Sequence, residues 1–191
     1  WSSDVCSSDL ALVCRYLLGA RGYNGALLMR VDNDLQPKVI QCDIHGANGL
    51  AFSADRRWMY TSDTPNAVIY RTPLDEQGEL GRREVFRRFQ PGEGIPDGAA
   101  IDVEGCYWSA MFDGWRIARF SPQGEELESY PMPVRCPTMV CFGGADMKTL
   151  YITTTRENME DDELAQYPLS GAIFTLPVAV AGMKKLPFRE C

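Results

Sequence analysis

The sequence predicts an all-β fold made of repeated antiparallel sheets. Two segments that start 49 residues apart, NGLAFSADRRWMYTSD (48–63) and DGAAIDVEGCYWSAMF (97–112), share one order of features: a polar residue, a glycine, a strand, an acidic turn and an aromatic strand. A third segment, PTMVCFGGADMKTLYIT (137–153), keeps the strands but lacks the leading amide or carboxylate. Repeats of roughly 40 to 50 residues that contain only strands and turns are typical of β-propeller blades. We therefore predict a partial β-propeller.

Each expected strand is a short apolar run bounded by turn residues. The expected strands are 25–31, 37–43, 48–53, 58–62, 67–72, 83–89, 97–102, 106–111, 116–120, 126–131, 138–142, 149–154 and 172–176. The polar segment from Arg156 to Gln166 is expected to form a loop or one helical turn. These strands make about three full blades and part of a fourth, so two sheet faces of the arc are expected to stay uncovered. Such faces favour marginal stability or self-association.

The first twenty residues do not fit the repeat. The segment WSSDVCSSDL (1–10) resembles the translation of a sequencing adapter, and the chain starts at Trp1. We expect residues 1–10 to be non-native, residues 1–20 to be a leader and residues 21–191 to be the propeller domain. A secretion signal is disfavoured because Arg15 interrupts the apolar run and an acidic, not basic, segment precedes it.

Composition restricts the classes of function. With 45% hydrophobic and 24% charged residues, the chain suits one soluble globular unit, and no apolar run is long enough to cross a membrane. The net charge of −7 disfavours binding to nucleic acid or anionic lipid. Seven cysteines without a CxxC pair are interpreted as reduced, buried thiols of a cytoplasmic protein. The single histidine, His45, interpreted as a surface loop residue, argues against a His-rich metal site or a Ser-His-Asp triad.

Asn48 and Asp97 are the main candidate site residues. In a blade, the innermost strand starts at one rim of the central channel and the second strand ends at the same rim. Asn48 and Asp97 start innermost strands of neighbouring blades, so we expect both at the channel mouth. The second strands and the turns after them bring Asp63, Trp115, Thr154 and Arg156 to the same rim.

An amide oxygen and a carboxylate are donors that Ca²⁺, Mg²⁺ and Mn²⁺ prefer. The alternative is that Asn48 and Asp97 are only turn residues before glycine, a position where Asn and Asp are common. Two protein ligands are too few for a firm site. We therefore expect a third, a carboxylate, from a blade outside this chain.

Several segments, taken together and in order, suggest a family. They are NGLAFSADRRWMYTSD, PDGAAIDVEGCYWSA, RIARFSPQGEELESYPMP, PTMVCFGGADMKTLYITTTR and PLSGAIF. This pattern resembles the sugar-lactonase family that includes gluconolactonase and senescence marker protein 30, or regucalcin. The resemblance implies a six-bladed propeller that hydrolyses a sugar lactone to the aldonic acid with one divalent metal ion (Ca, Mn, Zn, Mg or Fe).

The resemblance places the family's metal-binding Asn and Asp on Asn48 and Asp97. The family's first-blade Glu ligand and its substrate-binding Arg and Asn have no counterpart here. We therefore expect an N-terminally truncated fragment, about the C-terminal two thirds, that binds the metal weakly and shows little activity.

The resemblance also suggests roles for single residues. Asp97 is expected to take the proton of the attacking water, or to act only as a ligand. Asp63 is expected to bind a sugar hydroxyl or orient Asn48, unless it is a solvated turn residue. Trp115 is expected to stack on the sugar or to pack at the rim, and Arg156 is a weaker substrate-binding candidate. The alternative function is a noncatalytic propeller that binds calcium or a protein partner.

Overall fold

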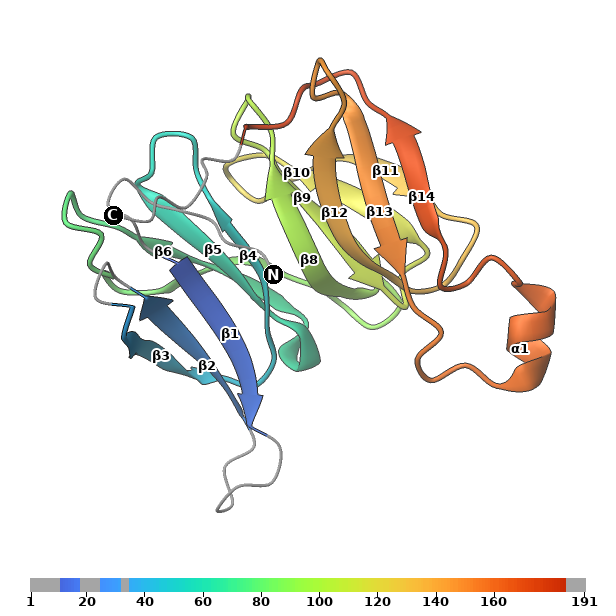
Figure 1. Cartoon of the computed structure of the whole chain (residues 1–191), viewed down its shortest axis with the longest axis horizontal. Coiled ribbons are helices and arrows are strands. Elements are labelled where there is room, and N and C mark those ends of the chain that lie inside the picture. Colours follow the sequence, from blue (N-terminus) through green and yellow to red (C-terminus); the bar gives the residue numbers. More distant parts are fainter. Residues whose placement is uncertain (1–10, 18–24, 32–34, 185–191) are drawn as a thin grey trace.

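The structure, a computed structural model, describes residues 11–17, 25–31 and 35–184. The all-β prediction is confirmed: the described residues form four sheets and one short α-helix. In each sheet, strands consecutive in the chain pair antiparallel with one another, as in a propeller blade (Figure 1).

Two of the sheets have three strands and two have four. The first contains β1 (Ala11–Leu17), β2 (Gly25–Val31) and β3 (Pro37–Ile44). The second contains β4 (Ala47–Phe52), β5 (Trp58–Asp63), β6 (Val68–Pro73) and β7 (Glu84–Arg88). The third contains β8 (Ile95–Ile101), β9 (Tyr107–Phe112), β10 (Arg116–Phe120) and β11 (Glu126–Pro131). The fourth contains β12 (Pro137–Gly143), β13 (Thr149–Thr154) and β14 (Ile173–Pro177).

Two short helical elements follow the second strands of their sheets. The 3-10 turn η1 (Thr64–Asn66) comes directly after β5. The helix α1 (Asp161–Gln166) lies between β13 and β14, where we predicted a loop or one helical turn. The expected boundaries of the eleven strands from residue 48 onward agree with the structure to within two residues.

Strand β1 corrects one expectation. Residues 11–17, expected in a leader, pair antiparallel with β2 from Ala11 opposite Val31 to Leu17 opposite Gly25. The first sheet therefore starts before residue 21. A short apolar run alone does not distinguish a leader core from a strand, which explains the error. Residues 1–10 and the expected turn at 32–34 lie outside the described residues.

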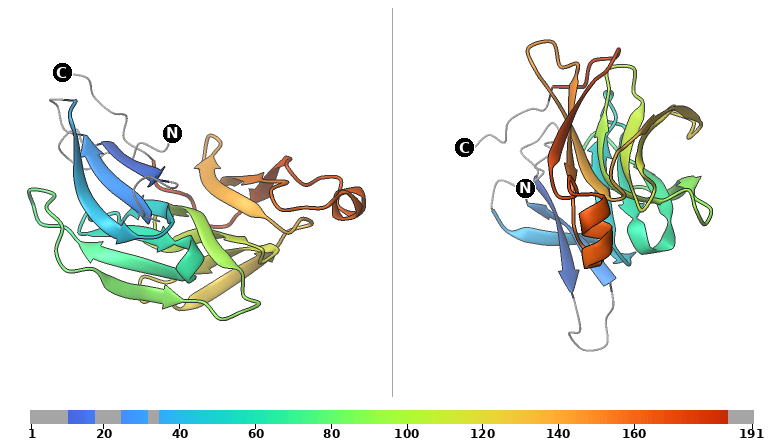
Figure 2. Two further views of the ribbon diagram at one scale, coloured as in Figure 1. Left: turned by 90° about the horizontal axis from the view of Figure 1, so that it is seen from below. Right: turned by 90° about the vertical axis from the view of Figure 1, so that its right-hand side faces the viewer.

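The sheets pack face to face in an arc (Figure 2). Aromatic side chains fill the space between the second and third sheets, including Tyr60 and Phe86 against Tyr107. Between the third and fourth sheets, Trp108 meets Phe142 edge-on at 5.5 Å. The innermost strands β4, β8 and β12 consequently lie side by side. This arrangement brings the starts of these three strands to one rim.

The outer face of the fourth sheet stays exposed. Tyr151 and Ile173 are 44% and 70% exposed, and Cys141 is exposed on the same face. Cys106 and Cys136 are buried free thiols, as expected, whereas Cys42 and Cys141 are exposed. The expectation of buried thiols is therefore wrong for these two cysteines. In the strand that carries Cys141, successive side chains point to a packed and an open face in turn, and Cys141 lies on the open face.

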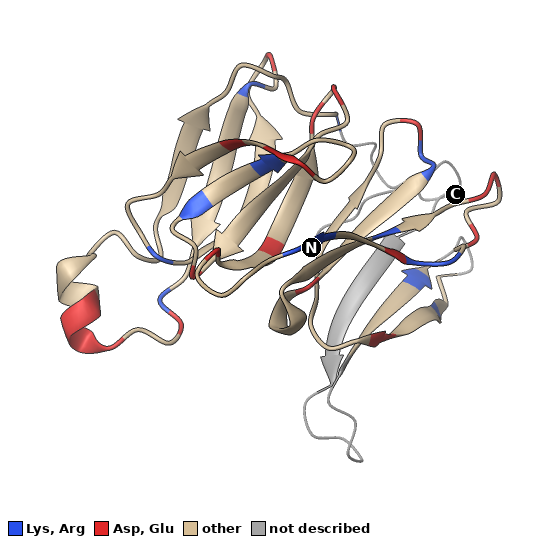
Figure 3. Cartoon of the chain, turned by 180° about the vertical axis from the view of Figure 1, so that it is seen from behind, with Lys and Arg blue, Asp and Glu red and all other residues tan. Residues whose placement is uncertain are grey.

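Acidic and basic residues occur in both strands and loops, with an acidic first turn in α1 (Figure 3). Within the part of the chain that the structure describes, no helix is long and apolar enough to cross a membrane.

Candidate functional site

The three neighbouring innermost strands each carry a β-bulge near their start. The register shifts by one residue between Asn48 and Ala51 in β4, between Pro96 and Ala99 in β8, and between Pro137 and Met139 in β12. A bulge bends its strand and changes the direction of nearby side chains, and bulges are common next to functional sites. A bulge therefore recurs at the start of each strand, with Asn48 as the last paired residue before the bulge of β4 and Asp97 inside the bulge of β8.

Asn48 is partly buried and reaches toward the next sheet. Its Nδ2 donates to the Oγ1 of Thr64 at 3.1 Å, and the Thr64 hydroxyl donates to the carbonyl oxygen of Pro96 at 2.8 Å. Since Pro96 precedes Asp97 in β8, this chain of bonds couples the Asn48 side chain to the strand that carries Asp97. Thr64 was not a predicted site residue. Its position in η1, after β5, became recognisable only from the structure.

Asp97 is a partly buried carboxylate without a strong partner. No hydrogen bond or ion pair reaches its side chain from the described residues. Burial raises the pKa of Asp97 to about 7, and the negative charge of Glu157 adds to the increase. A carboxylate in this state is energetically unfavourable. Such positions occur frequently at functional sites, where a ligand supplies the missing partner.

The backbones of β4 and β8 approach closely between Asn48 and Asp97. Gly49 has a φ of +56°, and a Cβ at this position would lie 2.9 Å from the carbonyl oxygen of Asp97. Glycine is required here by both the positive φ and the close contact. The structure therefore places the two predicted metal ligands on adjacent strands, in segments that touch.

Tyr107 supports this contact between β4 and β8 through a hydrogen bond to Gly49. Its buried hydroxyl donates to the carbonyl oxygen of Gly49 at 2.7 Å and lies 3.2 Å from the Ser62 hydroxyl. Burial raises the pKa of Tyr107, while the hydrogen bond with Ser62 acts in the opposite direction. The phenol consequently stays protonated and can donate to the bulge of β4.

Asp63 connects the segment before Asn48 with the turn η1. Its side chain is 2% exposed, so its interpretation as a solvated turn residue is wrong. The Oδ1 accepts from the backbone N–H of Gly46 at 3.0 Å, and the Oδ2 accepts from Asn66 Nδ2 at 2.9 Å. His45 is 63% exposed, as expected, and lies 3.6 Å from the same carboxylate. These bonds suit an orienting role, and a contact of Asp63 with substrate stays a prediction.

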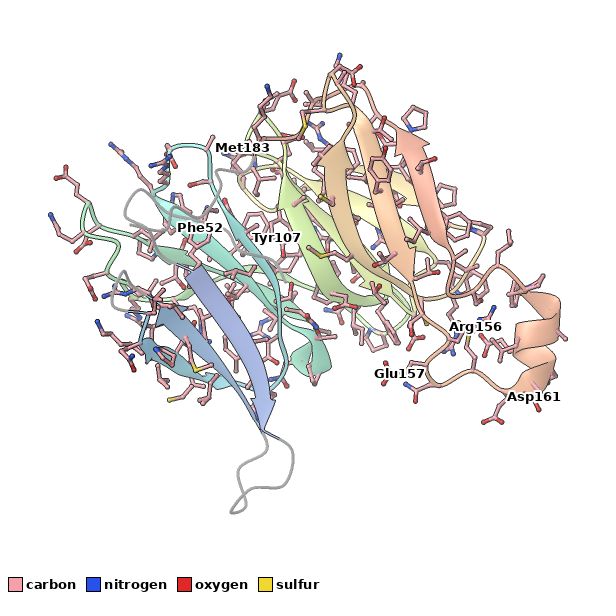
Figure 4. The ribbon with its side chains drawn as sticks, viewed as in Figure 1. Phe52, Tyr107, Arg156, Glu157, Asp161 and Met183 are labelled. Carbon is pink, nitrogen blue, oxygen red and sulfur yellow. The ribbon has the colours of Figure 1, made fainter. Side chains whose placement is uncertain are left out.

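Trp115 and Arg156 contact the segment between α1 and β14. The Trp115 ring packs edge-on against Tyr167 at 4.8 Å, which matches the alternative of packing at the rim. Arg156 is exposed and its Nε donates to the carbonyl oxygen of Ser170 at 2.7 Å, before β14. Figure 4 shows Arg156 and Glu157 in the loop between β13 and α1. Their contact with substrate stays a prediction.

Asn48 and Asp97 are a suitable type of metal ligand, but two ligands are too few for a complete site. Asn48 and Asp97 offer oxygen donors that hard divalent cations prefer. No group of three or more His, Cys, Asp or Glu side chains that could hold a metal occurs among residues 35–184 or the described side chains before them. The residues present therefore fit part of a hard-cation site.

Comparison with known proteins decides the family. The model of the family described as SMP-30/Gluconolactonase/LRE-like region matches residues 16–156. The chain belongs to this family. The match begins inside β1, in agreement with the pairing of that strand. The predicted resemblance to the gluconolactonase family is confirmed.

Relatives within the family include named lactonases. The chain is 54% identical over 163 residues to a 6-deoxy-6-sulfogluconolactonase of Pseudomonas putida, covering 85% of the chain and 56% of the relative. It is 33% identical over 164 residues to a pentonolactonase of Haloferax volcanii, covering 83% of the chain and 56% of the relative. Among solved structures, regucalcin of Agrobacterium tumefaciens, described as a calcium-binding protein, has a TM-score of 0.86 and 27% identity, over 95% of this chain and 61% of that one. The chain thus spans little more than half the length of these gluconolactonase-family relatives.

Proposed function

We propose that the chain forms the cation-binding rim of a divalent-metal-dependent sugar lactonase, which hydrolyses a lactone to the aldonic acid. The observation that carries this proposal is the close approach of β4 and β8, between Gly49 and Asp97. It supports a site formed by the amide of Asn48 and the carboxylate of Asp97, which has no partner among the described residues. The names of the lactonase relatives support the reaction class. The description of the regucalcin structure as calcium-binding supports the cation.

The two ligands have different chemical roles. A divalent cation held by Asn48 and Asp97 would supply Lewis-acid polarisation of the lactone carbonyl. Asn48 contributes an amide that does not titrate and is kept in place by Thr64. Asp97 can also accept the proton of the water that attacks the carbonyl carbon. The ring C–O bond then breaks, and its oxygen takes this proton from Asp97 to become a hydroxyl of the aldonic acid. The partial burial of Asp97 favours this second role, because few competing hydrogen bonds stabilise its charge.

Binding of Mn²⁺ tests the proposed ligands directly. Electron paramagnetic resonance of free Mn²⁺, titrated into the chain, measures the affinity without requiring catalysis. We expect Asn48→Ala and Asp97→Asn each to weaken Mn²⁺ binding at least about tenfold, the scale of losing a ligand-associated group. The matched control is Asp161→Asn, which removes an exposed carboxylate in α1 far along the chain from β8. Unchanged affinity in both site variants would overturn the proposed metal site.

Hydrolysis separates the lactonase from a noncatalytic binder. Proton release from δ-gluconolactone is measured with and without Mn²⁺ for the chain and for Asp97→Asn. We expect a small Mn²⁺-dependent rate that Asp97→Asn abolishes. Cation binding by Asn48 and Asp97 with no such rate would instead favour the alternative function, a noncatalytic calcium-binding propeller.

A further inference from the structure

Thr138 occupies in the fourth sheet the position that Asp97 occupies in the third. Each residue follows a paired proline near the start of an innermost strand, Pro137 in β12 and Pro96 in β8. Each also lies within the bulge that comes directly after that proline. The third repeat thus has a hydroxyl where the second has a carboxylate.

Thr138 and Asp97 are also neighbours in space. A Cβ on Gly98 would lie 2.6 Å from the carbonyl oxygen of Thr138 and 2.8 Å from the Cα of Met139. The backbone of β8 directly after Asp97 therefore contacts the bulge of β12. The segment of the fourth sheet that contacts the residue after Asp97 is thus the one that carries Thr138.

The Thr138 hydroxyl is hydrogen-bonded to the hydroxyl of Thr153, and solvent can reach this pair. Its Oγ1 lies 2.8 Å from the Oγ1 of Thr153 in β13, and Thr153 is exposed while Thr138 is partly exposed. Two hydroxyl groups carry two O–H donors, and a single bond between them uses one. The pair therefore keeps one donor and several acceptor lone pairs. Within the described residues, neither of these two side chains forms another hydrogen bond.

We infer that the Thr138–Thr153 hydroxyl pair binds a ring hydroxyl of the sugar lactone, beside the proposed cation ligands. This inference rests on the proposed function and names the part of the substrate that the fourth sheet recognises. A sugar hydroxyl both donates and accepts, so it matches the remaining donor and lone pairs of the threonine pair. Since both threonines are neutral, they add no charge next to Asp97 and Glu157. The site consequently discriminates hydroxylated rings from deoxygenated ones.

A polyol that cannot be hydrolysed tests the pair independently of turnover. The probe is 1,5-anhydroglucitol, in which a methylene replaces the carbonyl of δ-gluconolactone, and its affinity is measured by calorimetry in the presence of Mn²⁺. We expect Thr138→Val and Thr153→Val each to weaken binding about fivefold, the scale of one lost hydrogen bond. Valine keeps the β-branched shape, so both strands are expected to keep their conformation. The matched control, Thr175→Val, removes an exposed hydroxyl from β14 in the same sheet and should leave the affinity unchanged.

The outcomes separate this inference from the proposed function. Equal affinity of the parent chain and Thr138→Val, or an equal loss in Thr138→Val and Thr175→Val, overturns the inference and leaves the cation site untouched. Absence of polyol binding by the parent chain also overturns it. In that case, Mn²⁺ binding by Asn48→Ala and Asp97→Asn decides separately whether the proposed cation site exists. Mn²⁺ affinity should be unchanged in Thr138→Val.

Discussion

Asp63 and Asp97 are carboxylates near the same rim, but they differ in burial and in their hydrogen bonds. Asp63 is almost completely buried, and its two oxygens accept hydrogen bonds from Gly46, before β4, and from Asn66, in η1. Asp97 is less buried and has no such partner among the described residues. Hydrogen bonds compensate the cost of burying a charge, so Asp63 can stabilise the fold. Asp97 destabilises it in the absence of a ligand, which is the state expected of a residue retained for binding.

This difference predicts that Asp97→Asn stabilises the metal-free chain at alkaline pH. Burial raises the pKa of Asp97 to about 7, so the folded state binds the proton more tightly than the unfolded state. The penalty is therefore absent at low pH, grows as the pH rises from the unfolded value toward 7, and is complete above it. We expect Asp97→Asn to increase the free energy of unfolding at pH 8 by on the order of 2 kcal/mol.

Urea unfolding at pH 4.5 and pH 8, with chelator present, measures this effect. Asp161→Asn serves as the control, because Asp161 is exposed in α1. A stabilisation of the same size at both pH values would show that the neutral amide improves packing and that the carboxylate charge carries no penalty.

The sequence predicts where a residue lies in a strand better than it predicts the contacts of that residue. The two Asx-Gly pairs predicted that Asn48 and Asp97 start equivalent strands, because the repeat is a local pattern. The burial of Asp63 depends on Gly46 and Asn66 folding around it, and the role of Thr138 depends on a bulge in β12. Neither leaves a periodic signal in the sequence.

At the scale of elements, the bulges at the starts of β4, β8 and β12 position the site. Short apolar runs bounded by turn residues predicted these strands closely, because turn residues mark where a strand ends. The same signal cannot show where one extra residue enters a strand. It also failed for β1, whose apolar run was interpreted as part of a leader. The strands were thus predictable from local sequence, whereas the register that shapes the site required the paired structure.

The bulge of β4 predicts a large difference between two glycine substitutions. Gly49 has φ +56°, and an added Cβ would lie 2.2 Å from Ser62 Oγ and 2.3 Å from Tyr107 Oη. Gly92 also has positive φ, +91°, but nothing lies within 4 Å of an added Cβ. We expect Gly92→Ala to cost about 1 kcal/mol from backbone strain alone, and Gly49→Ala to cost more than about 3 kcal/mol because contacts add to the strain.

Chemical denaturation of both variants under identical conditions gives the comparison. The Gly49→Ala variant should also lose Mn²⁺ affinity, because the displaced backbone separates Asn48 from Asp97. Similar losses of stability in the two variants would mean that β4 and β8 can move apart at little cost, and would contradict the close contact on which the site depends.

At the scale of the whole molecule, each sheet depends on its neighbours for burial. The inner face of the fourth sheet packs Val140, Leu150 and Ile152 against the third sheet. The outer face of the same sheet exposes Tyr151, Ile173 and Cys141. Cross-strand pairing of Tyr151 with Thr175, and of Ile173 with Thr153, places these side chains on one surface. A sheet with one packed and one open apolar face is prone to pair with another molecule.

We therefore expect concentration-dependent self-association through the outer face of the fourth sheet. The double variant Tyr151→Lys with Ile173→Lys places two positive charges on this face, so two copies would bring like charges together and should remain monomeric. Sedimentation velocity over a range of concentrations, with a reductant to prevent oxidation of Cys141, measures the effect. Val103→Lys is the control, because Val103 is 57% exposed but lies in the turn after β8. Association of the double variant equal to that of the parent chain would place the contact elsewhere, since a hydrophobic pairing surface cannot accept two buried, unpaired lysines without a large loss of affinity.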